Sequence, residues 1–160
     1  LAARASWKAV MSNDREAWLD LMAEDICVED PIGVAPTNPS GKGVQGKAEL
    51  AELYDKNIGP NDITIETHSY RTAGLESAHE LPLRMAFGNG ATSSVTGFFT
   101  YLVNETGKLT RLRGYWDMAD MTFTPPTNCV GHPSRASVAR RAPSVLRPLR
   151  PGENHSRFLR

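Results

Sequence analysis

The stretch Val28-Glu29-Asp30-Pro31-Ile32-Gly33 decides the fold of this 160-residue chain. Apolar residues at positions 26 and 28 alternate with the residues between them, as in a strand that turns one face towards a core. Asp30 continues the same alternation, and Pro31 and Gly33 then end the strand. The pattern therefore places the Asp30 carboxylate at the end of a strand, facing inward among apolar neighbours.

A carboxylate in such a place can act as a base. Removing it from water raises its pKa and makes it a stronger proton acceptor. The alternative is that Asp30 caps a turn before Pro31, which is a common role for an Asp-Pro pair. The stretch taken alone leaves both interpretations open.

Apart from the strand that ends at Asp30, which lies between the second and third helices, the helical patterns precede the strand patterns. Three helices are expected first, over residues 2–11, 15–23 and 47–57. Strands with period-2 alternation follow, over residues 62–70, 77–87, 91–103 and 108–118, and Gly88-Asn89-Gly90 predicts a hairpin between two of them. Strands joined by hairpins after helices favour an α+β fold, in which an antiparallel sheet curls over the helices.

This order of elements resembles the ketosteroid isomerases. The resemblance covers residues 3–123 and depends most on the strand end around Asp30, the helix end Leu53-Tyr54 and the late strand end Gly114-Tyr115-Trp116. These enzymes belong to the nuclear-transport-factor-2-like superfamily, which also contains polyketide cyclases of the SnoaL type. The resemblance implies a cone-shaped fold with three N-terminal helices packed on a curved, mostly antiparallel sheet. It also implies a small hydrophobic ligand, a homodimer and no cofactor.

In ketosteroid isomerases an aspartate moves a proton between two carbons, while a tyrosine and a protonated aspartic acid hydrogen-bond the oxyanion. Asp30 matches that base. The family tyrosine falls at Ser6 or Trp7, and the family acid falls near Phe99. One oxyanion donor is worth about 10² to 10³ in rate, so efficient isomerisation requires donors from elsewhere.

Three residues are candidates for the missing proton donor. Tyr54 lies where family members carry a tyrosine of the active-site network, although it is equally typical of a half-buried core residue. His79 shares the apolar face of strand 77–87 and could pair with Asp30 for proton abstraction or dehydration, although a lone histidine there is more often a core residue. Tyr101 shares a face with Phe99 and could reach the same cavity. The expected catalytic residues are therefore Asp30, His79 and Tyr54.

A hydrophobic pocket is expected between the helices and the sheet. Its predicted substrate-binding residues are Trp18, Val28, Leu83, Phe99, Tyr101, Leu112 and Trp116. With four histidines and no acid at ligand spacing near them, the sequence predicts no metal site.

Two functions from different classes remain. The first is a steroid Δ-isomerase-like enzyme with Asp30 as general base. The second is a non-catalytic ligand-binding or dimerisation module of the same fold. Epoxide hydrolysis also occurs on this fold, using two aspartates and an arginine, but Arg111 and Arg113 are predicted on the face opposite Trp116. That outer face, with Arg84 and Tyr115, is the expected dimer surface.

Composition sets further limits. No run of about 18 apolar residues predicts a membrane span. The formal net charge is zero, but residues 124–160 hold seven arginines and one acid, Glu153, which leaves an acidic body unsuited to nucleic acid. The prolines of that segment predict a disordered tail after a domain at 1–123. Cys27 and Cys129 are poorly placed to pair, and the start lacks a hydrophobic signal region, so a cytoplasmic protein is expected.

Overall fold

Two short helices lead into the sheet. The computed structural model describes residues 2–127. Helix α1 spans Ala2–Met11 and α2 spans Arg15–Asp20. Asp14 separates them, and its side chain accepts a hydrogen bond from the Ala17 N–H at 3.0 Å. This contact satisfies one of the free donors at the start of α2.

The elements after α2 are mostly strands. Strand β1 spans Met22–Glu29, β2 spans Val44–Gln45, and α3 spans Gly46–Leu53 before a π-helical turn, η1, at Tyr54–Ile58. The later strands are β3 (Asp62–Ile65), β4 (Ser69–Ala73), β5 (Glu76–Ala86), β6 (Thr92–Val103) and β7 (Leu109–Tyr115). A 3₁₀ turn, η2 (Met118–Asp120), and β8 (Thr122–Thr124) end the described part.

The strands form one sheet in the order β2-β1-β7-β6-β5-β3, with β4 paired to β5 and β8 paired to β6. All pairs are antiparallel except β1 and β7, where Val28 lies opposite Leu112 and Glu29 opposite Arg113. Parallel neighbours end at the same edge of a sheet. The residues that follow β1 and β7 are therefore brought side by side.

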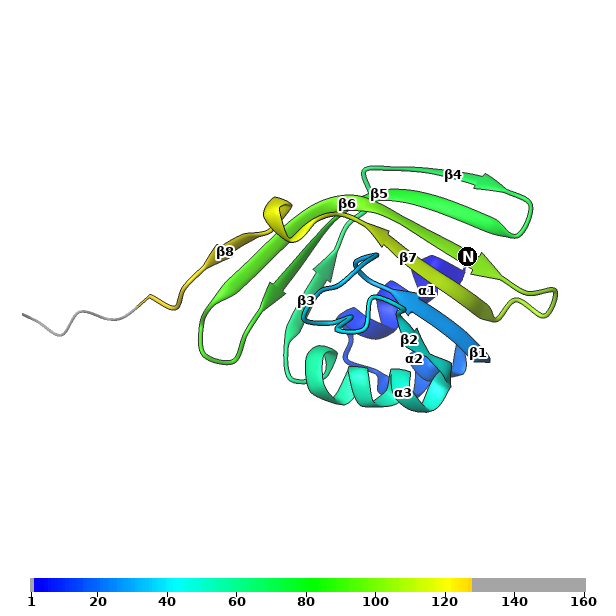
Figure 1. Ribbon diagram of the computed structural model, residues 1–160, viewed down its shortest axis with the longest axis horizontal. Coiled ribbons are helices and arrows are strands. Elements are labelled where there is room, and N and C mark those ends of the chain that lie inside the picture. Colours follow the sequence, from blue (N-terminus) through cyan, green and yellow to red (C-terminus); the bar gives the residue numbers. More distant parts are fainter. Residues whose placement is uncertain (1, 128–160) are drawn as a thin grey trace, which may run out of the picture. The chain divides into compact units, whose positions relative to one another are not determined.

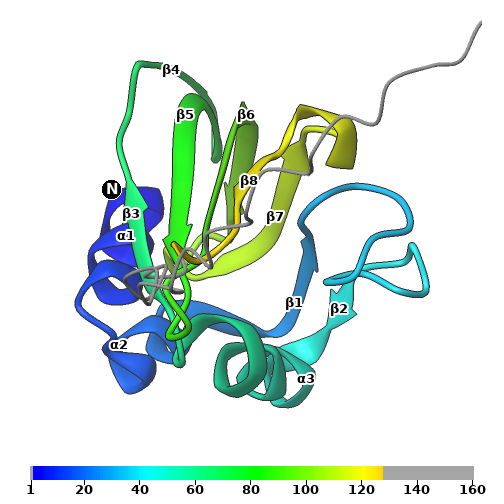
Figure 2. The same cartoon turned by 90° about the vertical axis from the view of Figure 1, so that its left-hand side faces the viewer.

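The sheet curls over the helices (Figures 1 and 2), as the α+β prediction required. A hydrophobic core lies between them and includes Ala3, Trp7, Ala9, Trp18, Leu19, Met22, Ile26, Val28, Leu50, Tyr54, Leu81, Phe99, Tyr101, Leu109 and Leu112. The inner face predicted for β6 is confirmed, since alternate residues from Ser93 to Tyr101 are buried. In β5 the alternation is less regular, because Pro82 is buried beside Leu81 while Leu83 is only half-buried. Leu112 and Gly114 of β7 are buried, and Arg113 between them is not.

Several element boundaries differ from the predictions. The second helix ends at Asp20 rather than Ala23, because Met22 is buried and already pairs with Leu109 of β7. The third helix widens into a π-turn at Tyr54. The strand predicted over 62–70 is two strands that pair with different parts of β5. Short strands β2 and β8 were not predicted.

The predicted tail, residues 124–160, is described only as far as residue 127, and 128–160 lie outside the described residues. Thr124 still belongs to β8 and pairs with Thr92 of β6. Among the helices at residues 2–127, none is long and apolar enough to cross a membrane.

Candidate functional site

A cavity of about 360 Å³ lies between the helices and the concave face of the sheet. All seven residues predicted to bind substrate line it: Trp18, Val28, Leu83, Phe99, Tyr101, Leu112 and Trp116. Met118, Met121 and Phe123 from the segment after β7 also line it, which the sequence did not indicate. A second depression, of about 500 Å³, opens on the outer face beside Asp25 and Arg111 and is mainly polar.

Asp30 lines the apolar cavity directly after the end of β1. Its Oδ1 accepts a hydrogen bond of 2.6 Å from the Trp116 indole Nε1, and Trp116 follows the end of β7. Burial raises the pKa of Asp30 from 3.8 to about 6, against a smaller lowering by the Trp116 hydrogen bond. The carboxylate is therefore ionised at neutral pH, yet it is a stronger base than an ordinary aspartate.

Two glycines make room for this pair. A Cβ on Gly114 would overlap Asp30 Oδ1 and lie 2.9 Å from Trp116 Nε1. A Cβ on Gly97, in the adjacent strand β6, would lie 2.9 Å from the Trp116 Cβ. Larger residues at either position would displace the indole or the carboxylate.

The loop after Asp30 is held by side chains. The Asp30–Pro31 peptide is cis, and the Asp30 carbonyl accepts a hydrogen bond of 2.7 Å from Thr37 Oγ1. Asn38 is only 2% exposed; its Nδ2 donates to the Pro31 carbonyl at 3.2 Å, and its Oδ1 accepts from the Gly43 N–H at 2.8 Å. The sequence did not single out Asn38, because nothing local separates it from the other polar residues of a Pro- and Gly-rich loop.

Tyr101 brings a hydroxyl to the same cavity from β6. Its oxygen accepts a hydrogen bond of 2.7 Å from the Trp7 indole Nε1 on α1. Burial raises the pKa of Tyr101, and the negative charge of Asp30 acts in the same direction, against the Trp7 hydrogen bond. Tyr101 is therefore protonated at neutral pH and can donate its proton.

His79 and Tyr54, the other two predicted catalytic residues, lie outside the cavity lining. His79 is buried, with its ring centroid 4.9 Å from that of Trp7 and 5.6 Å from that of Tyr101. Its Nε2 is 2.9 Å from Ser77 Oγ, and its Nδ1 has no hydrogen-bond partner among residues 2–127. Burial lowers the pKa of His79, so the ring is neutral. The imidazole therefore packs behind the two aromatic residues.

Tyr54 begins η1, is 2% exposed, and donates its hydroxyl proton to Asn13 Oδ1 at 2.8 Å. Its ring packs against Trp18, with centroids 5.3 Å apart. Asp30 thus shares the cavity with Tyr101, whereas Tyr54 and His79 support its walls. Among residues 2–127, no three His, Cys, Asp or Glu side chains cluster as a metal site would require.

A curled, mostly antiparallel sheet over three helices, with an apolar cavity and one inner carboxylate, defines the cone-shaped α+β fold of the nuclear-transport-factor-2-like superfamily. The chain belongs to the SnoaL-like domain family, whose model matches residues 3–112.

Solved structures agree with this assignment. The chain is 52% identical to a Δ5-3-ketosteroid isomerase from Mycobacterium sp., over 77% of this chain and 95% of that one, with a TM-score of 0.76. It is 44% identical to RV0760c from Mycobacterium tuberculosis in complex with estradiol-17β-hemisuccinate, over 76% and 95%, with a TM-score of 0.74. It is 40% identical to a computationally designed 17-OHP binder, over 77% and 95%, with a TM-score of 0.76.

Proposed function

We propose that this protein is a steroid Δ-isomerase-like enzyme in which Asp30 is the general base. The observation that carries the proposal is a single carboxylate held at an apolar cavity, with a pKa raised to about 6 by burial. A base with a pKa near the working pH is the most effective for proton transfer at carbon. The 52% identity to a ketosteroid isomerase supports the same chemistry.

The proposed step is an intramolecular proton transfer. The Asp30 carboxylate removes a proton from the carbon α to a carbonyl, the C–H electron pair moves into a conjugated enolate, and negative charge gathers on the carbonyl oxygen. Asp30 then returns the proton to the γ carbon, so that only a double bond has moved. Oδ1 already accepts the hydrogen bond from Trp116 Nε1, whereas Oδ2 accepts no hydrogen bond from residues 2–127. Oδ2 is therefore the oxygen that takes the proton.

The cavity supports a hydrophobic substrate. Its volume of about 360 Å³ and its mainly apolar walls suit a compact fused-ring molecule. One relative is complexed with a steroid ester and another is a designed steroid binder. We therefore assign 3-oxo-Δ5-steroids, or polyketides of similar shape, as the substrate class.

The test is an isomerisation assay on a 3-oxo-Δ5-steroid, followed by the absorbance of the conjugated product. We expect Asp30→Asn to lose most of the activity while it still binds the steroid. Asp25→Asn is the matched control, because Asp25 is exposed on the outer side of the same strand. Equal rates in Asp30→Asn and the unmodified protein would refute the base assignment.

A non-catalytic ligand-binding module is the second candidate function. The observation that favours it is that Ser6, Trp7 and Phe99 stand where the resemblance places the family tyrosine and acid. In that case the unmodified protein and Asp30→Asn would both bind the steroid tightly, and neither would isomerise it.

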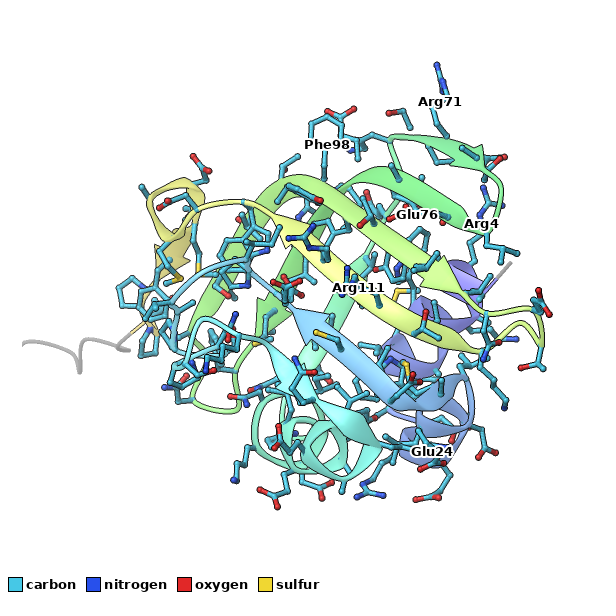
Figure 3. All side chains as sticks on the ribbon, turned by 45° about the vertical axis from the view of Figure 1, so that its right-hand side comes forward. Arg4, Glu24, Arg71, Glu76, Phe98 and Arg111 are labelled. Atoms are coloured by element: carbon cyan, nitrogen blue, oxygen red, sulfur yellow. The ribbon has the colours of Figure 1, made fainter. Side chains whose placement is uncertain are left out.

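The proposal also includes a homodimer that forms through the outer face of the sheet. It further includes a cytoplasmic location. Phe98 and Tyr115 lie opposite each other on β6 and β7 and are exposed, with the Arg113–Glu29 ion pair beside them. Figure 3 shows Phe98 and Arg111 on the side of the sheet away from the helices. Sedimentation analysis should show a dimer that Phe98→Glu converts to a monomer.

A further inference from the structure

Two tryptophans donate to two buried hydroxyl groups in the wall of the cavity. Trp7 Nε1 donates to the Tyr101 hydroxyl at 2.7 Å, and Trp18 Nε1 donates to Ser6 Oγ at 2.9 Å. An indole N–H can only donate, so each hydroxyl oxygen must be the acceptor in these bonds. Neither hydroxyl donates its own proton to any group among residues 2–127.

Both hydroxyls are removed from water. Ser6 is 2% exposed and Tyr101 is 5% exposed, and both line the same cavity as Asp30. A buried O–H group without an acceptor costs free energy, which a ligand oxygen would recover on binding. The two protons are therefore unused donors in a cavity that is otherwise mainly apolar.

We propose that Tyr101 and Ser6 are the donors that bind the carbonyl or enolate oxygen of the ligand, and that Trp7 and Trp18 orient them. The inference rests on the proposed function, since it names the groups that would stabilise the oxyanion which Asp30 creates. The resemblance places the family tyrosine at Ser6 or Trp7, so Ser6 offers a hydroxyl at that position, whereas Phe99 near the family acid offers no donor. Tyr101 lies two residues further along the same inner face of β6.

The surroundings hold these donors in place. Ser6 and Trp7 are neighbours on α1. Ser6 is one of the two donors, and Trp7 orients the other donor, Tyr101, through its hydrogen bond. The His79 ring makes edge-to-face contacts with both Trp7 and Tyr101. Donors fixed before the reaction need no reorganisation as charge develops. A hydroxyl that accepts a hydrogen bond is also polarised towards donating its own.

A binding experiment tests the donors without any turnover. In an Asp30→Asn background, which removes the charge that would repel an anion, the probes are 2-naphthol and naphthalene. The fraction of bound naphthol that is ionised is read from its absorbance. We expect the background protein to prefer 2-naphthol strongly and to bind it partly as the anion.

The substitutions then separate the two hydroxyls. We expect Tyr101→Phe to weaken naphtholate binding by about 10²-fold, the scale of one lost oxyanion donor. Ser6→Ala should weaken it by about tenfold, the low end of the range for a hydrogen bond to a charged group. Naphthalene affinity should not change. The matched controls, which should change neither affinity, are Tyr115→Phe on the outer face and Ser12→Ala beyond the end of α1. Ser6→Thr retains a hydroxyl and should restore most of the lost naphtholate affinity.

Three results would overturn the proposal. One is an Asp30→Asn protein that shows no preference for 2-naphthol over naphthalene. This result is read from the background protein alone, so it does not depend on whether a second variant folds. Another is an equal loss of affinity for naphtholate and naphthalene in Tyr101→Phe or Ser6→Ala, which would indicate a packing defect. The third is a retained ionised fraction in Tyr101→Phe or Ser6→Ala. The proposed isomerase could still hold in each of these cases, because it is decided separately by the steroid assay.

Discussion

Replacing Asp30 with asparagine should make the protein more stable at neutral pH while it removes the base. In the folded protein the pKa of Asp30 is about 6, against 3.8 for an ordinary aspartate. Each pKa unit corresponds to about 1.36 kcal/mol, so folding the ionised carboxylate costs up to about 3 kcal/mol. Asparagine carries no charge, and its Oδ1 can still accept the Trp116 hydrogen bond.

The folded and unfolded states lose the Asp30 proton at different pH values, and this difference sets the sign of the pH dependence of stability. As pH rises from about 4 to about 6, the unfolded chain loses the Asp30 proton first, and the folded protein retains it. The unfolded state then binds fewer protons, so the contribution of Asp30 to the free energy of unfolding falls with pH. The cost is absent below pH 3.8 and complete above a pH of about 6.

The assay is urea unfolding followed by tryptophan fluorescence at several pH values between about 4 and 7.5. The measured quantity is the free energy of unfolding of Asp30→Asn minus that of the unmodified protein, since other carboxylates then cancel. We expect this difference to grow by up to about 3 kcal/mol across the range. Asp25→Asn should show no such growth. A difference for Asp30→Asn that is independent of pH would refute the desolvation of this carboxylate.

Three further substitutions test the support of the site. Asn38→Ala should lower the free energy of unfolding by about 2 to 4 kcal/mol in urea, because the half-buried Gly43 N–H and the buried Pro31 carbonyl both lose their partner. A loss under about 0.5 kcal/mol would contradict this. Trp116→Phe removes the hydrogen bond that lowers the pKa of Asp30, so the acid limb of the kcat/KM profile should move to higher pH. An unmoved limb would exclude that role. Gly114→Ala should reduce kcat at least tenfold, as roughly 1.4 kcal/mol of lost positioning implies, and an unchanged kcat would show that the carboxylate tolerates the added Cβ.

Local patterns in the sequence were enough to predict the class of fold and one wall of the cavity. The alternation along β5, β6 and β7 determined which side chains face inward, because successive residues of any strand point to opposite faces. The same rule placed Asp30 inward at the end of β1. It could not locate element ends such as Asp20, where pairing of Met22 with β7 overrides helical spacing.

The tertiary structure alone decided which polar groups meet. Trp7 and Tyr101 are 94 positions apart, and Asp30 and Trp116 are 86 apart, so these hydrogen bonds depend on strand order and on how α1 packs. His79 obeys the alternation yet lies behind Trp7 rather than in the cavity. A repeating pattern determines the face on which a side chain lies. Its neighbours across that face are set by the curvature of the sheet and by helix packing, which no short stretch of sequence encodes.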